Sequence, residues 1–107
     1  MRVLEHLEPQ SVFSYFEDLC AIPHGSGNTK AISDYCVRYA EAHGFEVHQD
    51  ALNNIIMICP ATPGYESAEP VILQGHLDMV AEKAAACPLD LAKDGLDLAV
   101  DGDYVFA

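Results

Sequence analysis

One apolar run of the chain leads into two side chains suited to a metal site. Residues 70–74, Pro-Val-Ile-Leu-Gln, are followed by Gly-His-Leu-Asp-Met-Val at 75–80. The run predicts a buried strand that ends at His76. Alternate residues of an extended chain point the same way, so Asp78 could hold one ring N–H of His76 while the other ring nitrogen binds a metal. A catalytic zinc normally takes three protein ligands, so the others must come from elsewhere.

Length and charge limit the class of protein. The chain has 107 residues, 17 of them acidic and 5 basic, and a net charge of −12. This length allows one small domain. The charge argues against a nucleic-acid partner and against an anionic membrane surface, because no basic stripe can neutralise phosphates. No signal peptide and no apolar run of membrane-spanning length is visible, so we expect a cytoplasmic protein.

The cysteines fit an intracellular protein. Their spacing matches neither a compact disulfide framework nor a paired-cysteine zinc motif. We expect reduced, buried thiols that act as small hydrophobic residues, and redox or metal roles remain as alternatives. The four residues are Cys20, Cys36, Cys59 and Cys87.

Apolar spacing predicts two helices. The first begins at Pro9, which suits a first helical position, and carries apolar residues at helical spacing up to Cys20. The loop at 22–27 contains a proline and two glycines and ends this helix. A second helix is expected with Asn28 as its N-cap and Gly44 just beyond its C-terminus.

Strands are predicted after the helices. Residues 45–48 and 55–59 should pair antiparallel across a turn at 53–54. Residues 101–103, Asp-Gly-Asp, lie between two further apolar segments and predict a second hairpin. Because the sequence stops in an apolar strand soon after this turn, we expect that Ala107 is not the natural end of the protein.

Several strings together resemble a known family. They are Ile-Pro-His-Gly-Ser-Gly-Asn at 22–28, Gln-Gly-His-Leu-Asp-Met-Val at 74–80, Glu-Lys at 82–83, Lys-Asp at 93–94 and Val-Asp-Gly-Asp at 100–103. In this order they are similar to the N-terminal part of the bacterial aminoacyl-histidine dipeptidases. These enzymes, also called Xaa-His dipeptidases, are co-catalytic zinc peptidases, and some cleave carnosine. The likeness covers nearly the whole chain.

The resemblance implies roles for two residues. In that family the histidine matching His76 binds one of two zinc ions, with manganese or cobalt as other possible metals, and the aspartate matching Asp78 is a catalytic residue that orients it. The bridging aspartate, the other ligands, the glutamate base and the lid domain lie beyond the hairpin, in segments that this chain does not contain. Two departures from the family pattern are Ala81, where proline is common, and Leu89, where histidine is common.

The implied protein is therefore a metallo-dipeptidase of which this chain is a piece. Residues 1–107 would form the N-terminal portion of a catalytic domain of the α/β class, with part of a mixed twisted sheet flanked by helices. The whole protein would hydrolyse dipeptides with C-terminal histidine and form a homodimer through the missing domain. One metal ligand cannot assemble a dinuclear site, so we expect the 107-residue piece to be inactive.

Other interpretations remain open from the sequence. His76 could be a hydrogen-bonded structural residue, the chain could be a noncatalytic interaction module with an exposed sheet edge, or the parent could hydrolyse another amide such as an N-acyl amino acid. His24 is expected to make local hydrogen bonds, and His6, His43 and His48 are expected at the surface. The acidic residues between 90 and 103 lack the order of a calcium loop and predict a solvated hairpin rim.

Overall fold

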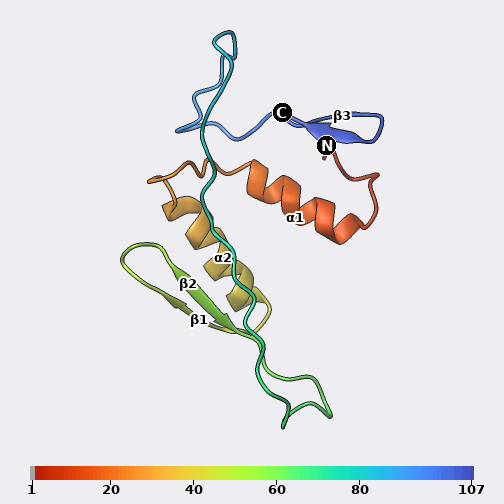
Figure 1. Ribbon diagram of the computed structural model, residues 1–107, viewed down its shortest axis with the longest axis vertical. Coiled ribbons are helices and arrows are strands. Elements are labelled where there is room, and N and C mark those ends of the chain that lie inside the picture. Colours follow the sequence, from red (N-terminus) through yellow and green to blue (C-terminus); the bar gives the residue numbers. More distant parts are fainter. Residues whose placement is uncertain (1) are drawn as a thin grey trace. The chain divides into compact units, whose positions relative to one another are not determined.

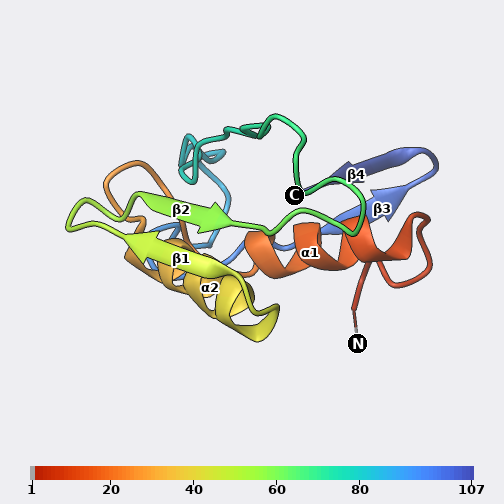
Figure 2. The ribbon, with the colours of Figure 1, turned by 90° about the horizontal axis from the view of Figure 1, so that it is seen from below.

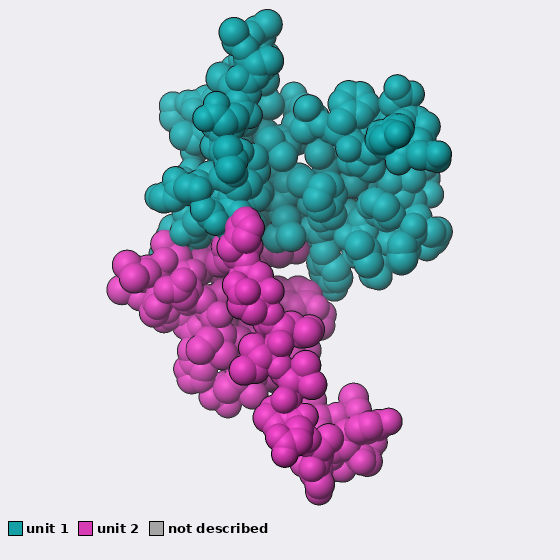
Figure 3. Space-filling model, viewed as in Figure 1, with its two compact units in different colours: residues 1–32, 78–107 teal, residues 33–77 magenta. Residues whose placement is uncertain are grey.

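The computed structural model describes residues 2–107 and confirms the α/β class (Figure 1). Its elements in chain order are α1 (Gln10–Cys20), α2 (Lys30–Ala42), β1 (Glu46–Gln49), β2 (Ile55–Ile58), β3 (Ala99–Asp101) and β4 (Tyr104–Phe106). They fall into two compact units (Figure 3): the residues up to Ile32 together with Asp78–Ala107, and Ser33–Leu77. Across residues 2–107, neither helix has the length and apolar character that crossing a membrane requires.

Helix α1 holds the N-terminal segment through one carboxylate. The backbone N–H groups of Val3 and Leu4 donate to the two oxygens of Glu17, at 2.6 and 3.2 Å. Leu4 is only 1% exposed, so this contact fixes one of the core side chains of its unit. The helix begins directly after Pro9, one residue later than the sequence predicts.

Helix α2 ends as its glycine predicts. Gly44 has a φ of 70°, and the N–H groups of Gly44 and Phe45 donate to the carbonyls of Glu41 and Ala40. This is a Schellman motif, which needs a left-handed residue that glycine adopts without strain. Asn28 is not the cap that the sequence predicts, because it lies two positions before the first helical residue and its side-chain amide donates to the carbonyl of Ala92, at 3.1 Å.

The first hairpin confirms the predicted antiparallel pair. Strands β1 and β2 pair from Glu46 opposite Ile58 to Gln49 opposite Ile55. The side chain of Gln49 donates to the hydroxyl of Ser33, at 2.7 Å, and that serine is fully buried. This bond gives a buried polar group its partner and holds the hairpin along α2 (Figure 2).

The turn of this hairpin is organised by Asp50. Its carboxylate accepts hydrogen bonds from the side chain and backbone of Asn54 and from the backbone of Leu52, at 2.8–2.9 Å. Asn53, with a φ of 67°, supplies the left-handed residue. The bonds from Asn54, and then that from Leu52, lower the pKa of Asp50, because they stabilise its charged form.

The second predicted hairpin is also confirmed. Strands β3 and β4 pair with Val100 opposite Val105 and Asp101 opposite Tyr104. The chain reverses through Gly102, whose φ of 55° suits a tight two-residue turn.

The predicted strand at 70–74 is not formed. Residues 70–76 have no regular secondary structure, and Val71, Ile72 and Leu73 are 82, 90 and 93% exposed. A strand is defined by ladder hydrogen bonds to a neighbour, and none of residues 2–107 supplies that neighbour here. The apolar sequence specifies a segment suited to burial, but burial also needs a second surface.

The cysteines carry free thiols, as expected, but not all are buried. Cys20 is buried, Cys36 and Cys87 are half-buried, and Cys59 is exposed, so the prediction of burial is wrong for Cys59. Burial raises the pKa of Cys20, with a further contribution from the charge of Glu17, and burial alone raises the pKa of Cys36. A raised pKa keeps these thiols protonated and unreactive at neutral pH.

The Asp50 turn should make stability depend on pH in acid. The folded pKa of Asp50 lies below its unfolded value, so its stabilising contribution is present above the unfolded pKa, about 4, and is lost as the pH falls through the folded pKa. Denaturant unfolding between pH 2 and 6 should show this loss in the wild type. Asp50→Asn keeps an acceptor oxygen but cannot titrate, so it should lack this part of the pH dependence. Identical profiles would contradict the assignment.

Candidate functional site

Two segments distant in sequence lie side by side around Met79. The N–H of Met79 donates to the carbonyl of His24, at 2.9 Å, and the N–H of Ser26 donates to the carbonyl of Met79, at 3.2 Å. Gly25 and Met79 thereby form an isolated parallel β-bridge. We call this pair of hydrogen bonds the 24–79 clasp. It fixes the loop at 22–28 against the segment that begins at Asp78.

Gly25 permits this close approach because it has no side chain. It is buried, and a Cβ atom built on it would lie 2.9 Å from the Cβ of Ala81, nearer than carbon atoms approach without strain. Pro23 cannot continue the helix that precedes it. Gly25 lets the chain pack against Ala81.

Asp78, one of the two predicted site residues, is held by the same loop. The hydroxyl of Ser26 donates to Oδ2 of Asp78, at 2.5 Å. The Asp78 residue is half-buried, and Ser26 is exposed. This contact joins residues 52 positions apart, and no sequence pattern predicts it.

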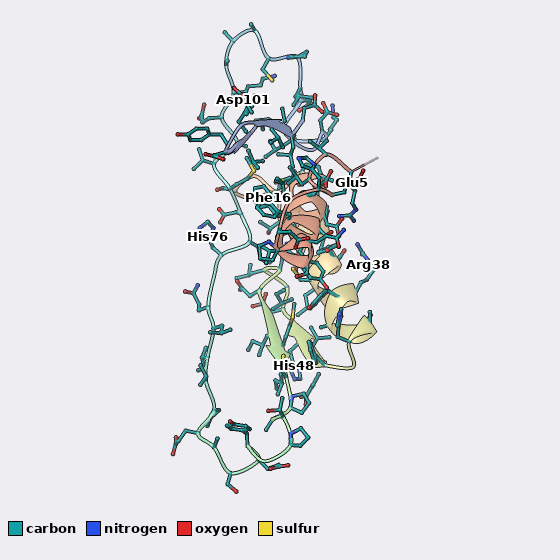
Figure 4. The ribbon with its side chains drawn as sticks, turned by 90° about the vertical axis from the view of Figure 1, so that its right-hand side faces the viewer. Glu5, Phe16, Arg38, His48, His76 and Asp101 are labelled. Atoms are coloured by element: carbon teal, nitrogen blue, oxygen red, sulfur yellow. The ribbon has the colours of Figure 1, made fainter. Side chains whose placement is uncertain are left out.

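His76, the other predicted site residue, lies at the end of the exposed segment described above (Figure 4). Its own side chain is exposed, and it belongs to the unit Ser33–Leu77. The roles of His76 as a metal ligand and of Asp78 as its orienting partner remain predictions.

The described part of the chain does not contain a complete metal site. Within residues 2–107, no group of three or more histidine, cysteine, aspartate or glutamate residues is placed to hold a metal ion. Because a catalytic zinc takes three protein ligands, His76 and Asp78 do not suffice to bind one tightly.

The other histidines make local contacts. Nδ1 of His24 lies within hydrogen-bonding distance of the carbonyl of Ile22, which confirms the expected local role. His43 contacts the carbonyl of Tyr39, at 2.8 Å, and the exposed His48 pairs with Glu46, at 2.7 Å.

The acidic stretch is a polar rim. Lys93 donates to Asp90 at 2.9 Å, and the N–H of Ala92 donates to the same carboxylate at 3.1 Å. These bonds lower the pKa of Asp90, the lysine contributing most. The carboxylate of Asp94 in turn accepts a hydrogen bond from the N–H of Asp90, at 2.7 Å, and such local bonds are typical of a solvated loop and not of a calcium site.

A small cavity behind the clasp is too small for a substrate. Its volume is about 10 Å³, and its lining includes Cys20, His24, Met79, Ala81 and Leu96. This is about the space of one water molecule. Two of its lining residues are joined by a backbone hydrogen bond, from the N–H of Leu96 to the carbonyl of Cys20, at 2.8 Å.

Comparison with known proteins finds two dipeptidases that resemble this chain. No protein-family model matches the chain. It is 39% identical over 107 residues to the cytosol non-specific dipeptidase of Escherichia coli (strain K12), a match that covers 100% of this chain and 22% of that protein. Its structure matches the crystal structure of aminoacylhistidine dipeptidase from Vibrio alginolyticus with a TM-score of 0.89 and 35% identity, over 95% of this chain and 21% of that one. Together, the two matches support a dipeptidase fragment.

The chain spans about a fifth of the length of these relatives. The resemblance to dipeptidases inferred from the sequence strings at 22–28 and 74–80 is confirmed by these two matches. Both strings meet in the 24–79 clasp, so the residues that carry the resemblance also make the best-defined contact near the predicted site.

The clasp can be tested by exchanging one methyl group between its two sides. Gly25→Ala should lower the free energy of unfolding by about 1–3 kcal/mol, because the new Cβ overlaps that of Ala81. Ala81→Gly removes the opposing atom, so the double variant should recover much of the loss in chemical denaturation. If the losses of the two single variants simply add in the double variant, the overlap of the two Cβ atoms is not the cause of the loss in Gly25→Ala.

Proposed function

We propose that the complete protein containing this chain is a metal-dependent dipeptidase, and that dipeptides with C-terminal histidine are among its substrates. The observation that carries the proposal is the fixed position of Asp78, bonded to Ser26 beside the 24–79 clasp, in a chain 39% identical to a named dipeptidase. In this proposal residues 1–107 are the N-terminal portion of the catalytic domain, and the protein is cytoplasmic.

The chain's own residues have two tasks in the proposed mechanism. His76 gives one imidazole nitrogen to a metal ion, and Asp78 accepts a hydrogen bond from the other, which fixes the tautomer and strengthens the ligand. Two zinc ions are the proposed cofactors, with manganese or cobalt as other possible metals. When bound, such ions supply Lewis acidity and make a coordinated water acidic. The other ligands and the general base would come from the rest of the complete protein.

The names of the two relatives describe different substrate ranges. The Escherichia coli relative is named a non-specific dipeptidase, whereas the Vibrio alginolyticus protein is named for aminoacylhistidine substrates. A panel of dipeptides that share the first residue and differ in the second would separate these possibilities. Inclusion of N-acyl amino acids would test the alternative amidohydrolase activity.

A second candidate is a noncatalytic interaction module, favoured by the exposed apolar run at 71–73. An unpaired apolar segment can add as a strand to another chain. In the dipeptidase proposal the same run instead joins a larger sheet within the complete protein. Homodimer formation, which we also propose, would then use another part of that protein.

The role of His76 can be tested in the complete protein. His76→Ala should lower kcat/KM for an Xaa-His dipeptide by more than about 100-fold, a larger loss than the removal of an outer partner of a metal ligand gives. It should also reduce the metal content measured by mass spectrometry. His48→Ala is the matched control, because this histidine is also exposed and pairs with Glu46, two positions before it in the same strand. Equal activity of His76→Ala and wild type would refute the proposal.

The isolated 107-residue chain should not hydrolyse dipeptides. His76 is a single candidate ligand, and a zinc ion held by fewer than three protein ligands lacks the support of a catalytic site. The purified chain, supplied with zinc, manganese or cobalt, should show no release of histidine above a metal-only blank. Hydrolysis that disappears in His76→Ala would show that the chain holds a working site by itself.

A further inference from the structure

We propose that Ser26 is a positioning residue for Asp78, acting through the hydrogen bond from its hydroxyl to Oδ2 of that carboxylate. The inference rests on the proposed function and extends it, because it gives the loop at 22–28 a task in the metal site. Ser26 itself is not expected to touch the metal or the substrate.

The contact is specific because the backbone on both sides is fixed. Ser26 donates through its N–H to the carbonyl of Met79, the residue that follows Asp78, and Met79 donates back to the carbonyl of His24. The 24–79 clasp thus sets the register between the two segments before the side chains meet. The hydroxyl of Ser26 then needs only one side-chain rotation to reach the carboxylate.

The hydrogen bond from Ser26 restricts the terminal side-chain torsion of Asp78, which sets the direction of its carboxylate. The terminal torsion of an aspartate is broad, so its two oxygens are not directed by the backbone alone. A hydroxyl bound to a carboxylate makes a charge-assisted hydrogen bond, which is stronger than a neutral one. With Oδ2 held by Ser26, the direction of Oδ1 is also set. The direction of a carboxylate determines how well it can orient a histidine ligand.

A side chain with a hydroxyl is needed at position 26, because the hydroxyl is the donor of this hydrogen bond. Alanine at position 26 would remove the donor of the hydrogen bond to Oδ2 of Asp78. Threonine keeps the hydroxyl and adds a methyl group on an exposed residue. If Ser26→Thr keeps the zinc affinity that Ser26→Ala loses, the hydrogen bond and not the packing of the side chain is responsible.

The test uses the complete protein with four variants: Ser26→Ala, Ser26→Thr, His76→Ala and the control Ser67→Ala, which changes an exposed loop serine. Zinc affinity is measured by competition with a chromophoric chelator, and kcat and KM with an Xaa-His dipeptide. Ser26→Ala should weaken zinc binding and lower kcat by about 10-fold each, at the lower end of the effect of outer partners, with KM nearly unchanged. Ser26→Thr and Ser67→Ala should resemble wild type.

The outcomes separate the two proposals. If His76→Ala loses zinc and activity while Ser26→Ala matches Ser67→Ala, the positioning role is overturned and the dipeptidase proposal stands. If the wild type neither binds zinc nor cleaves dipeptides, the proposed function fails and takes this inference with it. A double-mutant cycle adds a check: in the Asp78→Ala background, Ser26→Ala should have no further effect on zinc affinity. An undiminished effect there would also overturn the role.

Discussion

The 24–79 clasp is the contact on which the candidate site depends. Two backbone hydrogen bonds join a loop that follows α1 to a segment more than fifty positions later, and the buried Gly25 allows the close approach. Without them, the loop strings and the Asp78 segment would be separate pieces of chain. The clasp converts two short motifs into one local structure, and Ser26 and Asp78 meet as a consequence.

A second organising contact holds the unit Ser33–Leu77. The buried hydroxyl of Ser33 needs a partner, and Gln49 of β1 provides it. This bond, the Schellman motif at Gly44 and the Asp50 turn together determine how α2 connects to the β1–β2 hairpin. The same unit contains the exposed run at 71–73, so a well-formed hairpin and an unpartnered apolar segment occur in one compact body.

The exposed run connects the fold to the proposed function. It leads directly to His76, so in the dipeptidase proposal a surface that covers Val71, Ile72 and Leu73 would also fix the backbone before that histidine. Burial of three large apolar side chains contributes several kcal/mol, roughly 1.5–3 for each. In the dipeptidase proposal, that energy would place the metal ligand as well as complete the sheet.

The sequence by itself determined the local elements and the resemblance to dipeptidases. The helix at 10–20, the Gly44 end of α2 and both hairpin turns follow from apolar spacing and from residues that favour particular backbone angles, which are properties of neighbouring residues. The motif strings indicated the dipeptidase family and singled out His76 and Asp78. Only the tertiary structure revealed the partner of Asp78, the need for Gly25 and the absence of a ladder at 70–74, because each depends on atoms distant in sequence. Sequence periodicity reports which side chains favour burial, whereas the surface that buries them is a property of the folded chain.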